Sequence, residues 1–151
     1  MRVHYTDGTD EVFGRLCSEL DSNLDELVGG AQQRKEYVQY NTLENIRDVI
    51  VIYEEDVPVA CASFKHYDKN IAELKRVYVK PAYRGKGIST YLITTIENQA
   101  KVKGYHTMVL ETGKPLLAAA GLYHKMGYKI IDNYGQYKDM KDSICMEKAL
   151  L

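Results

Sequence analysis

The chain lacks tryptophan, has only two phenylalanines and three prolines, and contains no apolar run near the roughly 20 residues of a membrane-spanning helix. Its first residues, Met1-Arg2-Val3-His4-Tyr5, hold no apolar core typical of a secretory signal, and acidic residues follow at Asp7 and Asp10. We therefore expect a cytoplasmic protein with no membrane partner.

Neither sign of charge dominates, because 20 lysines and arginines stand against 21 aspartates and glutamates, for a net charge of −1. A nucleic-acid-binding domain usually carries a basic surplus or stripe, so we expect no nucleic-acid partner. The three cysteines lie far apart without a Cys-x-x-Cys pair, and the four histidines show no spacing typical of metal ligands. The composition predicts reduced, buried thiols and no metal.

The 151 residues, 45% of them hydrophobic, are enough for one domain that covers residues 1–151 and buries a sizeable core. Apolar, β-branched runs predict strands at residues 2–6, 49–53, 57–64, 71–79, 107–110, 128–131 and 144–147. Helical spacing predicts helices at residues 12–20, 24–28, 88–100 and 115–127, the first of them capped by Thr9. Because helices interrupt the strands in both halves, the order indicates an α/β fold with a mixed sheet.

The most informative segment runs from a predicted strand through a glycine-rich turn into a predicted helix. It reads Val77-Tyr78-Val79-Lys80-Pro81-Ala82-Tyr83-Arg84-Gly85-Lys86-Gly87-Ile88-Ser89. A helix N-terminus exposes unpaired N–H groups and glycine permits close approach, so the pattern indicates an anion site, usually for phosphate. The segment does not match a P-loop, which would need Ser or Thr where Gly87 stands. It also does not match the dinucleotide-binding fingerprint, which would need a third glycine at Thr90.

Arg84-Gly85-Lys86-Gly87-Ile88-Ser89 resembles the Gln/Arg-x-x-Gly-x-Gly/Ala motif of the Gcn5-related N-acetyltransferase (GNAT) superfamily, with Ser89 in place of the last small residue. Residues 72–79, 110–113 and 119–128 resemble the family's fourth strand, fifth strand and fourth helix. The resemblance covers about residues 48–150 in the correct order, whereas the first 45 or so match only in element order. It implies a mostly antiparallel central sheet flanked by helices, with two strands splayed apart for acyl-CoA.

The resemblance also implies acetyl-CoA as the cosubstrate. Its pyrophosphate would rest on the backbone N–H groups of Arg84, Gly85, Lys86, Gly87, Ile88 and Ser89. Its pantetheine arm would pair with the exposed backbone of Val77, Tyr78 and Val79, as an added strand does. A cofactor-contacting Asn or Gln of the family falls on Leu116, which cannot make that hydrogen bond.

For the chemistry, the resemblance implies direct attack of an amine on the thioester. Tyr123 occupies the family's general-acid position and would protonate the leaving thiolate. Glu73 is our candidate for the base that deprotonates the amine, and Glu111 is a second, weaker candidate. A backbone N–H near Val79 would stabilise the oxyanion. The loop over residues 134–142 would either line the acceptor pocket or merely connect strands.

The sequence thus predicts an acetyl-CoA-dependent N-acetyltransferase that acts on a primary amine of a small molecule or peptide. Two alternatives stay open: a non-catalytic acyl-CoA-binding or sensing domain of the same fold, and an acetyltransferase directed at nucleic acid, which the net charge disfavours. The acceptor is not determined by the sequence. A homodimer is common among soluble proteins and is compatible with this chain.

Overall fold

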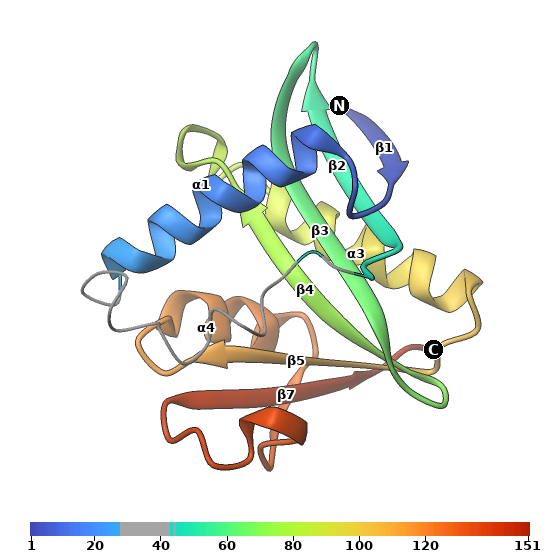
Figure 1. The fold of residues 1–151 in the computed structure, drawn as a ribbon, viewed down its shortest axis with the longest axis vertical. Helices are drawn as coiled ribbons and strands as arrows, with labels where there is room; N and C mark the ends of the chain where they lie inside the picture. The colour runs from blue at the N-terminus through green and yellow to red at the C-terminus, as the bar shows by residue number, and fades with distance from the viewer. Residues whose placement is uncertain (28–42, 44) are drawn as a thin grey trace.

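The computed structural model describes residues 1–27, 43 and 45–151 and shows a seven-stranded mixed sheet between helices (Figure 1). The sheet order is β1-β2-β3-β4-β5-β7-β6. The described elements are β1 (Arg2–Thr6), α1 (Glu11–Leu27), β2 (Asp48–Glu54), β3 (Val57–Asp68), β4 (Ile71–Val79), the 3-10 turn η2 (Pro81–Tyr83), α3 (Ile88–Val102), β5 (Thr107–Gly113), α4 (Leu117–Lys125), β6 (Lys129–Ile131), η3 (Gly135–Tyr137) and β7 (Ser143–Ala149). The predicted α/β class and mixed sheet are confirmed.

The contact between β4 and β5 is short. These strands run parallel and pair only over Ile71–Glu73 against Thr107–Val109. All other neighbouring strands pair antiparallel. Beyond Glu73 the two strands diverge, as Figure 1 shows. The splay that the family resemblance implies is therefore present, and it opens one edge of β4.

A bulge changes the course of β4 just past the point of divergence. Ser63 of β3 pairs with Lys75 and Cys61 pairs with Tyr78, so one residue of β3 lies opposite two of β4. Arg76, within the bulge, has φ +58°, a left-handed conformation that is uncommon outside glycine. The bulge lets consecutive residues of β4 reach the same face of the sheet.

Helix α1 covers one face of the sheet and is continuous, whereas the sequence predicted two helices with a break after residue 20. No glycine or proline lies between Leu20 and Leu24, so nothing in the sequence ends the helix there. The last residue of the predicted second helix, Val28, lies outside the described residues. Asp10, not Thr9, caps α1, because its Oδ1 accepts the Phe13 N–H at 3.0 Å.

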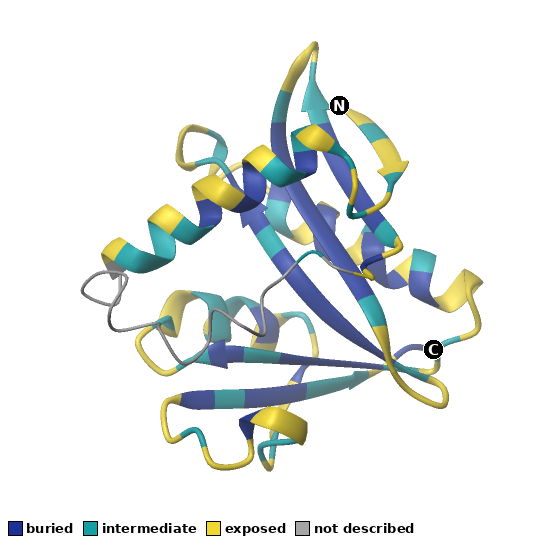
Figure 2. Cartoon of the chain, in the orientation of Figure 1, coloured by how far each residue is buried: buried dark blue, intermediate teal, exposed yellow. Residues whose placement is uncertain are grey.

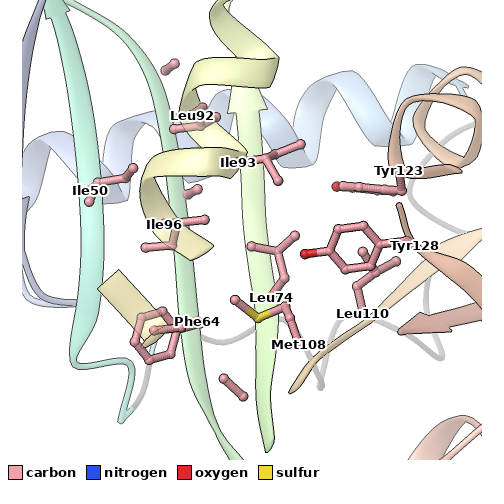
Figure 3. Packing of buried hydrophobic residues seen from close by; sticks show 14 of the residues in the cluster. Ile50, Phe64, Leu74, Leu92, Ile93, Ile96, Met108, Leu110, Tyr123 and Tyr128 are labelled. Atoms are coloured by element: carbon pink, nitrogen blue, oxygen red, sulfur yellow. The ribbon is translucent and has the colours of Figure 1, made fainter. Parts of the chain in front are cut away.

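Helix α3 covers the opposite face, the main core lies between α3 and the sheet, and a smaller apolar cluster lies beneath α1. Figure 2 shows the central strands almost entirely buried, and Figure 3 shows Leu92, Ile93 and Ile96 of α3 projecting toward the strands. These three side chains have no exposed surface. The core continues toward Tyr123 and Tyr128, so the helix that follows the glycine turn and the element that carries Tyr123 are packed into one cluster.

Among the described helices, none combines the length and the apolar character needed to cross a membrane.

Replacing Ile96 by alanine would test the α3 core. Ile96 is fully buried, whereas Val102 on the same helix is 79% exposed. We expect Ile96→Ala to lower the free energy of unfolding by about 2–5 kcal/mol, because it leaves a cavity. The control Val102→Ala should change it by less than about 0.5 kcal/mol. Denaturant unfolding measures both, and equal effects would contradict the packing described.

Candidate active site

A cavity of about 300 Å³ lies at the divergence of β4 and β5. Its walls come from β4, β5, α1, α4 and the loop that precedes β7. The lining residues are Leu20, Leu24, Glu73, Leu74, Lys75, Arg76, Val77, Leu110, Glu111, Thr112, Gly113, Pro115, Leu116, Ala119, Tyr123, Tyr137 and Asp142. Three of our candidates, Glu73, Glu111 and Tyr123, therefore share one cavity.

The cavity reaches both faces of the sheet. Leu20 belongs to the apolar cluster beneath α1, whereas Tyr123 belongs to the cluster beneath α3. A single cavity lined by both passes between β4 and β5, where no backbone pairing closes the sheet. Two ligands that approach from opposite faces can meet in it.

Glu73 is the last residue of β4 that pairs with β5 and is only 2% exposed. The Tyr134 hydroxyl donates a hydrogen bond of 2.6 Å to Glu73 Oε2. Lys75 Nζ lies 3.9 Å from Glu73 Oε1. A buried carboxylate needs such partners, since desolvation otherwise disfavours its charge.

Glu111 faces the cavity from β5. Ser143 Oγ donates a 2.8 Å hydrogen bond to Glu111 Oε2. Burial raises the pKa of the Glu111 carboxyl above its ordinary value, although the Ser143 hydrogen bond opposes the shift. Glu111 thus holds a proton more readily than an exposed glutamate.

Tyr123 comes from α4 and packs edge-to-face on Tyr128, with ring centroids 5.7 Å apart. Figure 3 shows its hydroxyl pointing away from α4, toward the side chains of α3. Burial raises the pKa of the Tyr123 phenol above its ordinary value. The hydroxyl therefore stays protonated at neutral pH and can act as a proton donor.

The glycine turn precedes α3 and is arranged as an anion site. Gly85 and Gly87 have φ of +78° and +80°, and Gly87 caps α3 without help from a side chain. Within the described residues, the N–H groups of Gly85, Lys86 and Gly87 donate to no backbone carbonyl, whereas the Arg84 N–H donates to the Pro81 carbonyl at 3.3 Å. A Cβ built on either glycine meets no atom within 4 Å. The turn therefore offers free donors, the positive end of a helix dipole and open space.

The exposed edge of β4 connects this turn to the cavity. The Lys80 N–H donates to the Val59 carbonyl at 2.9 Å, so strand alternation directs the N–H and carbonyl of Val79 to the opposite edge, away from β3. Arg84 Nε donates to the Val79 carbonyl at 2.9 Å. From the sequence, only the backbone of Arg84 was predicted to have a role, in phosphate binding. The structure shows that the Arg84 side chain also links the turn to the end of β4 through this hydrogen bond.

Leu116 stands at the N-cap of α4, makes no capping hydrogen bond and lines the cavity. At the position where the resemblance predicts a polar residue, the cavity wall is therefore apolar.

The structure also assigns contacts that the sequence left open or missed. Of the loop over residues 134–142, Tyr137 and Asp142 line the cavity and Tyr134 binds Glu73, so the loop is part of the site. Lys75 was missed, although its alternation with Glu73 in a predicted strand was a usable signal. By contrast, the turn over residues 84–89 does not line the cavity.

Arg76 was also missed. The bulge directs its side chain to α1, where one terminal nitrogen donates to the Cys17 carbonyl and contacts Asp21 Oδ2, both at 3.0 Å. The sequence offers no marker for a bulge, so this contact could not be foreseen. No group of three or more His, Cys, Asp or Glu side chains able to hold a metal occurs in the part of the chain that the structure describes.

Comparison with known proteins gives relatives of one kind. An "IAA acetyltransferase" of Azospirillum brasilense is 29% identical over 137 residues, which cover 90% of this chain and 89% of that protein. A Xenopus tropicalis protein named "Probable N-acetyltransferase 14" is 32% identical over 105 residues, or 69% of this chain. The chain spans about half of that relative's length, 51%.

Solved structures agree with the fold. A Klebsiella pneumoniae protein described as an acyl-CoA N-acyltransferase is similar with a TM-score of 0.80 and 26% identity, covering 99% of this chain and 97% of that one. Other structures of this fold were solved with acetyl-CoA or coenzyme A bound. The model of the "Acetyltransferase (GNAT) family" matches residues 16–128. Together with the splayed strands and the glycine turn, that match shows that the chain belongs to the GNAT family of acetyltransferases.

Proposed function

We propose that this protein transfers the acetyl group of acetyl-CoA directly to a primary amine of a small molecule or peptide. The observation that carries the proposal is the cavity through the sheet, which has Glu73 and Tyr123 in its walls. It would let an amine and a thioester approach from opposite faces. Family membership supports acetyl transfer in general, and the geometry supports the assignment of roles.

Acetyl-CoA would bind with its pyrophosphate on the N–H groups of residues 85–89, where the turn offers donors and space, whereas the Arg84 N–H is held by the Pro81 carbonyl. Its pantetheine arm would extend along the free edge of β4, over residues 77–79. This path would run from the turn to the cavity and would bring the thioester to the point where β4 and β5 diverge. The Val79 N–H, directed to that edge, would stabilise the oxyanion.

Glu73 would accept the proton that the ammonium must lose before it attacks, since only a neutral amine has a free lone pair. The Tyr134 hydrogen bond fixes the orientation of its carboxylate. The cavity wall holds three acidic side chains, Glu73, Glu111 and Asp142, against two basic ones, Lys75 and Arg76, which favours a cationic over an anionic acceptor.

Tyr123 would give its proton to the coenzyme A thiolate as the C–S bond breaks. The raised pKa of its phenol keeps that proton in place until a stronger base forms.

The alternative of an acyl-CoA-binding domain without catalysis is favoured by one observation, the apolar Leu116 at the cavity wall.

Free thiol release tests the proposal and separates it from that alternative. With acetyl-CoA and a panel of amino acids, polyamines and lysine peptides, we expect release with at least one amine. Glu73→Gln should lower kcat about 10²–10⁴-fold because the base is lost. Glu111→Gln should have a much smaller effect. Binding of acetyl-CoA without turnover of any amine would favour the non-catalytic domain. A larger fall in kcat for Glu111→Gln than for Glu73→Gln would make Glu111, not Glu73, the base.

Gly87→Glu tests the anion site, and Gly104 supplies a matched control. Gly104 has φ +95° at the other end of α3, and a Cβ there also meets nothing within 4 Å. The control is Gly104→Glu. Both substitutions put a side chain at a positive φ, but only Gly87→Glu places a carboxylate at the proposed phosphate site. We expect it to weaken coenzyme A binding by more than about 100-fold, because like charges in contact cost several kcal/mol. Calorimetric titration measures the affinity of each variant for coenzyme A. Equal affinities in the Gly87 and Gly104 variants would show that the turn does not bind the phosphates.

Tyr123→Phe tests the proton donor, with Tyr5→Phe as the control, since Tyr5 is 57% exposed on β1. Loss of a general acid should lower kcat about 10²–10⁴-fold with little change in acetyl-CoA affinity. Because the pKa of Tyr123 is raised, wild-type kcat should not fall through its ionisation up to about pH 10, where ordinary tyrosine ionises. Stopped-flow or steady-state assays across pH measure this; a phenylalanine variant as fast as the parent would leave Tyr123 a packing residue.

A further inference from the structure

Lys75 is a buried lysine inside the cavity that the proposed reaction does not use. It lies two residues after Glu73 on β4, so both side chains project from the same face of the strand. Its side chain is only 6% exposed, and it lines the cavity together with Tyr123. The face is the one covered by α1, from which an acceptor amine would enter.

The amine of Lys75 stands beside the groups that an acceptor amine needs. Its Nζ lies 3.9 Å from Glu73 Oε1 and donates to the Tyr137 hydroxyl at 3.4 Å. These two contacts are long for their kind, so a rotation of the lysine side chain could turn Nζ toward the thioester, and loss of a proton to Glu73 would then supply the nitrogen lone pair.

The environment of Lys75 also disfavours the charged, protonated form of its side chain. Burial lowers the pKa of its ammonium, and Glu73 opposes the shift only in part. A larger fraction of Lys75 is therefore neutral at a given pH than of an exposed lysine, and the neutral amine is the nucleophile.

We propose that Lys75 is itself an acetyl acceptor, so that this chain acetylates its own cavity when no amine is bound. The inference rests on the proposed function. Lys75 Nζ attacks the thioester carbonyl and a C–N bond forms. The C–S bond then breaks, the amine proton passes to Glu73, and the coenzyme A thiolate takes a proton from Tyr123. The products are Nε-acetyl-Lys75 and coenzyme A.

Acetylation would change the site in two ways. It removes the positive charge beside Glu73, and it adds an acetyl group to a cavity of about 300 Å³. The loss of charge by itself would not repel a cationic amine, but the acetyl group would occupy space in the cavity that the amine needs. Modified protein should therefore acetylate other amines more slowly, and the modification would act as a self-inactivation of idle enzyme.

The test is mass spectrometry of the full chain after incubation with acetyl-CoA and no amine, with peptide mapping of every lysine. We expect one acetyl group per chain at Lys75, including any already present on purification, and one thiol released for each acetyl group added during the incubation. Lys75→Arg should abolish this acetylation, because the guanidinium keeps its charge and is no acceptor. The control Lys129→Arg, at a lysine whose side chain is 77% exposed, should not.

Two further readouts separate enzymatic from chemical acetylation. Glu73→Gln should slow the modification of Lys75 about 10²–10⁴-fold and leave that of exposed lysines unchanged. The rate at Lys75 should level off at a lower pH than the rate at exposed lysines, which keeps rising to about pH 10.4. Acetyl groups spread evenly over exposed lysines, or none at Lys75, would overturn the inference. If thiol release with an added amine persists in that case, the proposed function stands; if it is also absent, both fail.

Discussion

The site depends on one constraint in the sheet: β4 and β5 pair over only three positions before they diverge. Parallel strands that stay paired would close the sheet and hide the backbone of β4 from a ligand. Divergence after Glu73 instead leaves the far half of β4 with an unpaired edge and opens a passage between the two faces. An open edge is ordinarily a liability, because its N–H and carbonyl groups seek partners. Here it lies next to a glycine turn with free donors, so one extended, anionic ligand could satisfy both.

The bulge in β4 is the second element of this arrangement. Before it, Glu73 and Lys75 face α1 while Leu74 enters the main core; at it, Arg76 joins the α1 face. Three charged residues are thereby buried side by side. Burial of charge is costly, and each has a partner: Tyr134 for Glu73, Glu73 for Lys75, and Asp21 for Arg76. Such a set of paired, buried charges at a cavity is typical of a functional site rather than of a packing core.

Local patterns were enough to predict much of the fold. The boundaries of β4 agree with the predicted strand at residues 71–79, because β-branched residues end abruptly at Pro81. The turn between β4 and α3 was also predictable, since Gly85 and Gly87 adopt the positive φ that glycine favours. The length of α1 was wrong because polar residues such as Asp21 fit a helix as well as a loop. The strands β3 and β5 extend beyond their predicted ends because strand pairing carries them past their apolar runs.

What the sequence by itself determined is therefore local, namely the element order and the glycine turn, whereas Glu73 and Tyr123 became candidates through the family resemblance. The element order and the turn depend on neighbours within a few positions of the chain. The tertiary structure alone decided that Tyr134 binds Glu73, 61 residues away, and that Lys75 shares the cavity with Tyr123. The reason is physical. Such contacts depend on strand order, on the register of β5 with β7 and on where β4 bulges, and these are set by the packing of the whole sheet rather than by any one segment.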